Sequence, residues 1–160
     1  MLRETASSTR FLYTTFFLSG DAFSKAEPLT INSKNYSIKN PSVSPDGKTI
    51  YFASNMPGGF GQFDIYKASI EADGQLGTAV NMGQKVNTEG QEMFPYISTK
   101  NTLYFSSTGH LGLGGMDVFY TKEIDGKMAP IRNVGIPINS NGDDFAFSMN
   151  EETGEGFVSS

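Results

Sequence analysis

The chain of 160 residues contains no cysteine and no tryptophan, and its single histidine is His110. The lack of cysteine excludes disulfides and thiolate metal sites, and it leaves the redox compartment unassigned. A zinc site built on histidine would find no second histidine here. There is also no run of 18 or more apolar residues, so the sequence predicts no membrane-spanning helix.

Positive charge is scarce as well. The formal net charge is −5, and only three of the twelve basic residues are arginines, namely Arg3, Arg10 and Arg132. Nucleic-acid surfaces need clustered cations, so this balance argues against nucleic-acid binding. The 38% of hydrophobic residues and 12% of aromatic residues predict a folded domain with a core rather than a disordered segment.

The first 17 residues carry Arg3, Arg10 and an apolar patch over residues 11–18 that is interrupted by Tyr13 and two threonines. A secretory signal peptide needs an uninterrupted apolar stretch and a small-residue cleavage site, and neither is evident. We therefore assign these residues to the repeat described next and predict no export signal in the chain.

Two sets of aromatic residues recur along the chain with one interval. They are Tyr13, Tyr66 and Phe119 in one set, and Tyr51, Tyr104 and Phe157 in the other. Each set steps by 53 positions (for example, 66 − 13 = 53). Two independent sets with one period indicate an internal repeat, and a repeat of roughly 40–50 residues made of short strands is typical of β-propeller blades.

Each complete repeat is expected to form four short strands. In the first repeat these are residues 40–44, 48–54, 63–70 and 76–82. Pro45-Asp46-Gly47 predicts the first turn, because proline presets φ and glycine accepts a positive φ. The strand segments are rich in β-branched and aromatic residues. In the second repeat, strands are expected over residues 94–98, 102–107 and from 116 onward, with a fourth ending near Asn133.

We predict an all-β fold, a partial β-propeller of four-stranded antiparallel blades, with about three blades present. The chain divides into an N-terminal extension (1–9) and a propeller segment (10–160). The latter comprises a partial blade (10–39), two full repeats (40–91 and 92–142) and a partial blade (143–160). Closed propellers need roughly four to eight blades, and open strand edges invite pairing. We therefore expect flanking sequence to supply the remaining blades, with closure by assembly of several copies as the alternative.

Several segments resemble a known family of repeats. Residues 40–54 and 61–66 resemble the TolB-type, WD-like β-propeller repeat. Residues 92–97, 103–119 and 139–147 are similar to the propeller region of OmpA-family bacterial envelope proteins, some of whose relatives belong to type IX secretion and gliding machinery. In that family the propeller precedes a carboxypeptidase-regulatory-like domain and a peptidoglycan-binding OmpA domain. The resemblance covers residues 10–160.

The resemblance implies a periplasmic, outer-membrane-associated location and partners that are envelope proteins or cell-wall material, bound through the loop rim. No OmpA-type domain is present in this sequence, so direct peptidoglycan binding is not carried over. The envelope location depends on the family alone, because no export signal is seen.

Asp64 and Asp117 occupy the same repeat position, directly before the aromatic core of the third strand. Paired carboxylates can serve acid–base catalysis. A residue that recurs in each blade more simply meets a need of each blade, and we predict that both cap backbone N–H groups of the preceding glycine-rich turn. For His110, in the second of these turns, we expect packing or hydrogen bonding within its own loop.

Residues 139–144 (Asn-Ser-Asn-Gly-Asp-Asp) have the composition of the start of a calcium loop, but counting from Asn139 puts Asn150 where a glutamate is needed. Gly112-Leu113-Gly114-Gly115 lacks the spacing of a dinucleotide loop, and no Gly-x-Ser-x-Gly motif occurs. We therefore predict no catalytic, cofactor or metal site.

The aromatic residues of the second strands are expected to form core between blades rather than a stacking platform for ligands. They are Tyr51, Phe52, Tyr104, Phe105 and Phe157.

The predicted function is a non-catalytic scaffold or protein-interaction module of a bacterial envelope protein. One alternative is the propeller domain of a prolyl-oligopeptidase-type hydrolase, which a neighbouring α/β-hydrolase domain would favour. Another is a glycan-binding propeller that uses loop aromatics such as Phe60. Fold alone does not decide among them.

Overall fold

The computed structural model describes residues 18–19, 22–23 and 28–160, and every regular element in these residues is a β-strand. The all-β prediction is therefore confirmed. The predicted extension (1–9), Tyr13 and residues 10–17, 20–21 and 24–27 of the predicted partial blade (10–39) lie outside the described residues. The described part holds no helix of the length and apolar character needed to cross a membrane.

The first complete blade is a four-stranded antiparallel sheet. Its strands are β3 (Ile38–Val43), β4 (Thr49–Ser54), β5 (Asp64–Ser69) and β6 (Val80–Asn81), paired in that order. The predicted turn forms, with Gly47 at φ 71° and its N–H donating to the carbonyl of Ser44. The fourth strand is shorter than predicted: residue Leu76 joins Ile70 only through an isolated bridge.

The second blade repeats this arrangement. Its strands are β7 (Glu92–Ile97), β8 (Thr102–Ser107), β9 (Asp117–Ile124) and β11 (Arg132–Asn133), with β10 (Lys127–Met128) extending the outer hairpin. The β8 strand has the predicted bounds, whereas β7 starts two residues earlier than predicted. The register of β8 on β9 matches that of β4 on β5, since Phe105 faces Phe119 as Phe52 faces Tyr66.

Two short sheets flank the complete blades. At the C-terminal end β12 (Phe145–Met149) pairs antiparallel with β13 (Gly156–Ser159), within the predicted partial blade (143–160). Near the N-terminus β1 (Leu18–Ser19) pairs with β2 (Ala22–Phe23).

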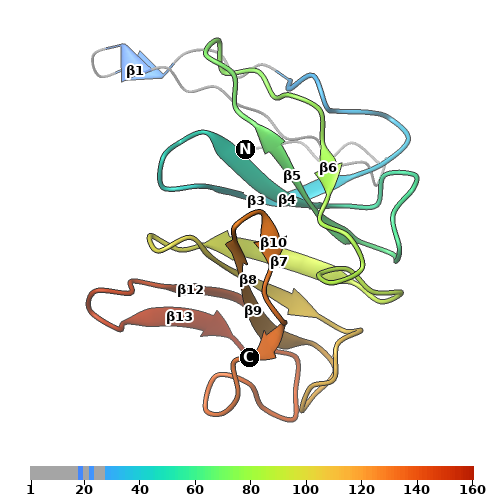
Figure 1. Ribbon diagram of the computed structural model, residues 1–160, viewed down its shortest axis with the longest axis vertical. Coiled ribbons are helices and arrows are strands. Elements are labelled where there is room, and N and C mark those ends of the chain that lie inside the picture. The colour runs from blue at the N-terminus through green and yellow to red at the C-terminus, as the bar shows by residue number, and fades with distance from the viewer. Residues whose placement is uncertain (1–17, 20–21, 24–27) are drawn as a thin grey trace.

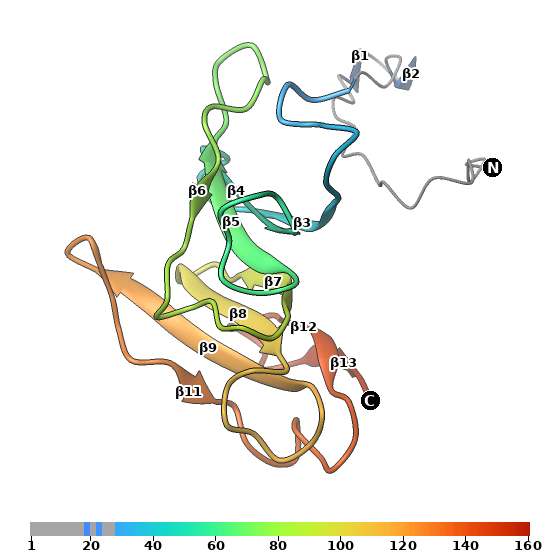
Figure 2. The same ribbon diagram turned by 90° about the vertical axis from the view of Figure 1, so that its right-hand side faces the viewer.

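The first blade lies above the second in Figure 1, and β12 and β13 lie to the left of β8 and β9. Figure 2 shows the first blade above the second, with β12 and β13 beside β8. Ala53 and Ile65 of the first blade share a buried cluster with Leu103, Phe105 and Phe119 of the second. Each sheet thus buries one face against its neighbour, as propeller blades do.

The outer face of the first blade is covered rather than bare. Phe52 and Tyr66 pack with Leu29, and Ile31 and Tyr36 lie against the same cluster. This face of the first blade is therefore not a bare apolar surface.

Each first strand contains a bulge at one repeat position. The ladder register shifts between Lys39 and Ser42 in β3, and equivalent shifts occur in β7 and β12. The bulged residues Asn40, Phe94 and Ala146 have φ of 51°, 52° and 55°. This left-handed conformation is unusual for residues other than glycine and increases the local twist of the strand.

Candidate functional site

The glycine-rich loop before β5 is held by a buried carboxylate. Asp64 is almost fully buried and accepts hydrogen bonds from the N–H groups of Phe60 (2.6 Å) and Gly61 (3.0 Å). The side-chain amide of Asn81 donates to the same carboxylate at 2.8 Å. This arrangement confirms the predicted capping role, because the carboxylate accepts hydrogen bonds from backbone N–H groups of the loop that precedes it.

Asp117 repeats this role in the second blade. Its Oδ2 atom accepts hydrogen bonds from the N–H groups of Leu113 (2.9 Å) and Gly114 (3.0 Å). A Cβ atom added at Gly112 would meet this carboxylate. The N–H groups that a phosphate would need are thus turned inward to a side chain of the protein.

Each of the two capped loops has an exposed apolar residue at the same repeat position. Phe60 is 40% exposed and Leu113 is 51% exposed, and the N–H group of each is fixed by the buried acid of its blade. We call Phe60 and Leu113 the loop rim. Phe60 is a candidate from the sequence alone, whereas Leu113 was not predicted, although it lies 53 positions later, at the repeat interval.

Asn139, from the candidate calcium segment, is a structural residue. It is buried, and its side chain accepts from the N–H of Val118 and donates to the carbonyl of Val118 and to Asn133. Asn87 makes the same three contacts in the preceding blade, with Ile65 and Asn81. This amide pair ties the connection between blades to the third strand, and sequence reasoning did not identify it.

The acids of that segment cap backbone groups as well. Asp144 is buried and accepts from the N–H of Ser140 at 2.5 Å, and Asp143 accepts from the N–H of Met116 at 2.9 Å. Across residues 28–160 no three acidic, histidine or cysteine side chains gather as a metal site would require. The segment is thus engaged in loop contacts.

Glu92 is the equivalent of Asp144 and was not singled out from the sequence. It is fully buried, and its carboxylate accepts from the N–H and hydroxyl of Thr88 and from the hydroxyl of Ser107. Three donors satisfy this buried charge. Because Glu92 and Asp144 occupy equivalent positions in consecutive repeats, the repeat itself could have predicted the same capping role for both.

His110 bonds outside its own loop, in contrast to the prediction. Its Nε2 atom lies 2.9 Å from the carbonyl oxygen of Val86, in the connection between blades. The imidazole also contacts Phe105 and Phe119, with ring centroids 5.7 and 5.2 Å away. The side chain therefore joins two blades and packs against their shared core.

The aromatic residues of the second strands divide between two faces. Phe52 and Phe105 are fully buried. Tyr51 packs against the shared core of the two blades, and Tyr104 lies 5.0 Å from Phe147 of the next sheet. Phe157 occupies the same position but is 83% exposed, so the prediction of core burial is wrong for this residue.

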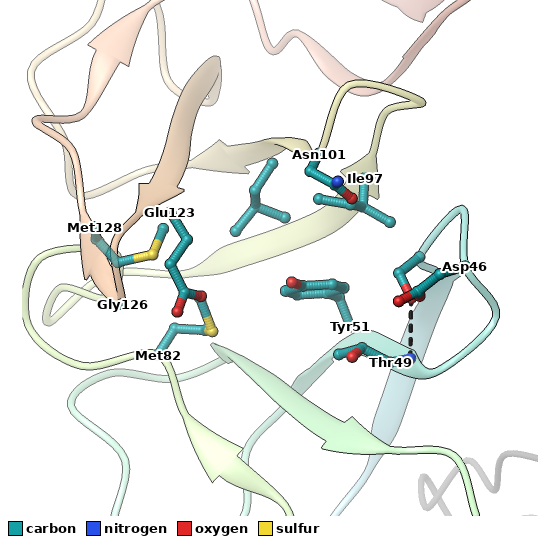
Figure 3. Close-up of a pocket in the computed structure, with 11 residues that line it drawn as sticks. Asp46, Thr49, Tyr51, Met82, Ile97, Asn101, Glu123, Gly126 and Met128 are labelled. Carbon is teal, nitrogen blue, oxygen red and sulfur yellow. Dashed lines mark hydrogen bonds between the residues drawn. The ribbon is translucent and has the colours of Figure 1, made fainter.

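A pocket of about 340 Å³ opens between the two complete blades. Figure 3 shows Tyr51 at its centre, with Glu123 on one wall and Asp46 on the other. Met82 and Met128 lie beside Glu123 in this view. These residues come from strands and turns of different blades, so no local sequence pattern predicts that they meet.

The charged groups of the pocket are already engaged. Glu123 forms an ion pair with Lys67 at 2.9 Å. The hydroxyl of Ser44, followed by the N–H of Lys48, lowers the pKa of Asp46 below its ordinary value. Burial raises the pKa of Tyr51. The pocket can accept a small polar group, and the hydroxyl of Ser44 in its lining donates to the carboxylate of Asp46 at 2.6 Å.

The chain is similar to several solved structures, one of which is a TolB protein. The crystal structure of TolB from Acinetobacter baumannii matches with 17% sequence identity and a TM-score of 0.48, over 84% of this chain and 34% of the TolB chain. The chain thus spans about a third of the length of that structure. No protein-family model and no curated protein matches the sequence. The blades are identified here by their own strand order and packing.

Proposed function

We propose that this chain is a non-catalytic protein-interaction module in which propeller blades present a loop rim to a partner. The observation that carries the proposal is the repeated presentation of Phe60 and Leu113 by buried carboxylate caps. A loop fixed in this way loses little conformational freedom on binding.

The partner is proposed to be an envelope protein or cell-wall material, and the location to be the periplasm in association with the outer membrane. The support is the resemblance of residues 92–97, 103–119 and 139–147 to the propeller region of OmpA-family proteins. A net charge of −5 disfavours nucleic acid as the partner. Flanking sequence is proposed to supply the remaining blades.

The rim can be tested with paired substitutions that leave the caps intact. The double variant Phe60→Ser/Leu113→Ser is expected to bind purified peptidoglycan sacculi or solubilised outer-membrane proteins more weakly than the parent. The matched control is Val80→Ser/Ile124→Ser, which removes side chains that are 54% and 57% exposed at the outer edges of the blades. Equal binding by both double variants would refute the rim.

The alternative functions have their own readouts. A glycan array in which binding depends on Phe60 but not on Leu113 would favour a glycan-binding propeller. An α/β-hydrolase domain with Gly-x-Ser-x-Gly in the same open reading frame would favour the hydrolase, whereas an OmpA-like domain would favour the envelope scaffold.

A further inference from the structure

The acidic residues of the described chain gather at one end of the blades. In an up-and-down antiparallel sheet the turns after the first and third strands lie at the same end, opposite the loop after the second strand. We call the end with these turns the acidic end. Its turns hold eight acidic residues and three lysines, over residues 44–48, 70–75, 98–101, 123–127 and 150–155. The loops at the other end hold three acidic residues and one lysine, over residues 55–62, 83–91, 108–116 and 134–144.

The pocket between the two complete blades opens at the acidic end, and its lining holds two carboxylates and no basic residue. Asp46 accepts hydrogen bonds from Ser44 and Lys48 through Oδ1 alone. Glu123 accepts from Lys67 through Oε2 alone. Within residues 28–160 nothing donates to Oδ2 of Asp46 or to Oε1 of Glu123. Each carboxylate therefore has one oxygen left for a donor from outside the chain.

The space between these carboxylates is lined by an aromatic ring and by apolar side chains. Tyr51 lies between Asp46 and Glu123, and Met82 and Met128 lie beside Glu123 (Figure 3). The face of an aromatic ring attracts a cation, most often a guanidinium group. Methionine side chains adapt to the shape of an aliphatic chain that packs against them. The pocket thus combines surfaces for both parts of a long basic side chain.

We propose that this pocket binds an arginine side chain from a basic segment of a partner protein. The guanidinium group is planar and carries five N–H donors, so it can lie over Tyr51 and donate to the free oxygens of both carboxylates. Its methylene chain would pack on Met82 and Met128. The volume of about 340 Å³ lies within the range of roughly 300–1,000 Å³ that is usual for ligand pockets.

The charge around the pocket favours the same class of partner. An acidic surface speeds the approach of a basic segment and disfavours an acidic one, and the effect weakens as salt is added. The pocket lies at the opposite end of the blades from the loop rim, so this proposal and the proposed function of the rim can fail separately.

The proposal can be tested by NMR titration of the ¹⁵N-labelled chain with the peptide acetyl-Ser-Gly-Arg-Gly-Ser-amide. We expect chemical-shift changes at the amides of residues 44–51 and 123–128, and none at Phe60 and Leu113. The same peptide with citrulline in place of arginine has nearly the same shape but no charge, and it should bind at least about tenfold more weakly. Shift changes confined to the loop rim, or equal binding of the two peptides, would overturn the proposal.

Two variants with the same chemical change separate the pocket from the overall charge. Glu123→Gln is expected to weaken binding of the arginine peptide about tenfold. The matched control is Glu155→Gln, an exposed acid at the same end that does not line the pocket, and it should weaken binding less than about twofold. Glu123 is itself exposed, so its ion pair with Lys67 contributes little to folding. Equal weakening by both variants would mean that the peptide responds only to net charge and would overturn the assigned pocket.

Discussion

At the scale of single residues, the chain uses one buried acid for each loop. Asp64 and Asp117 accept bonds from the N–H groups of their glycine-rich loops, and Glu92 and Asp144 do the same for the connections between blades. A carboxylate with several N–H donors is stable when buried, because its charge is compensated by fixed dipoles. The acids are therefore explained by loop geometry and need no catalytic role.

We predict that Asp117→Ala lowers the free energy of unfolding by about 1–3 kcal/mol, because it leaves the N–H groups of Leu113 and Gly114 without their acceptor. Urea denaturation measures this difference. The control is Asp143→Ala, which removes an acid with a single exposed contact and should change stability by less than about 0.5 kcal/mol. If the urea midpoint of Asp117→Ala equals that of the parent, the cap does not stabilise the fold.

At the scale of the elements, the bulge in each first strand stores local strain. Ala146 is exposed and has φ of 55°, a conformation that costs a residue with a Cβ atom roughly 1–2 kcal/mol. We predict that Ala146→Gly raises the free energy of unfolding by up to about 1 kcal/mol, since glycine adopts this conformation freely.

The matched control for the bulge is Ala72→Gly, in an exposed turn where φ is not positive. There the extra freedom of the unfolded chain dominates, so the same substitution should lower stability by about 0.4–1 kcal/mol. Thermal unfolding of the two variants should thus shift in opposite directions. Shifts of the same sign would mean that the bulge is not strained.

Some strands and turns could be predicted from the sequence, and others could not. Turn residues and β-branched runs act locally, so the bounds of β8 and the turn at Gly47 followed from the sequence. The bulges did not, because they arise from how a first strand bends against its neighbours. The fourth strand was predicted too long, since only Val80 and Asn81 form a regular strand against β5, while Gly77 and Met82 make single backbone bonds to it.

In the candidate site, too, local contacts could be predicted from the sequence, whereas contacts between blades could not. The capping role of Asp64 and Asp117 was predictable because donors and acceptor lie within four residues of each other. The contact of His110 with Val86 spans two blades, and the pocket around Tyr51 is lined from both blades. Such contacts depend on how sheets pack, which a periodic pattern does not specify.

At the scale of the whole molecule, a carboxylate in the turn between β12 and β13 contacts the second blade. Glu151 accepts from the N–H of Lys100 (2.9 Å) and the hydroxyl of Thr99 (3.3 Å). Burial raises the pKa of Glu151, but bonds from Ser98 and Lys100 outweigh this effect and leave the pKa below its ordinary value of 4.5.

This lowered pKa makes the contact sensitive to acid. A carboxyl group whose pKa falls on folding stabilises the fold above its unfolded pKa, and this contribution is lost as the pH falls through the folded pKa. We predict that Glu151→Gln lowers stability at pH 7 but changes it less at pH 3. Urea unfolding at both pH values checks this, and an equal difference at both would contradict the assigned contact.

Because of how the blades stack, the same repeat position contributes differently to the free energy of unfolding in two repeats. Tyr104 and Phe157 hold the same place in their repeats, but Tyr104 packs on Phe147, whereas Phe157 is exposed. We predict that Tyr104→Ala lowers the free energy of unfolding by about 2–4 kcal/mol through lost contacts, while Phe157→Ala changes it by less than about 0.5 kcal/mol. Paired denaturant titrations measure both. Equal losses of unfolding free energy would mean that the aromatic side chain stabilises its own strand and that packing between neighbouring blades contributes little.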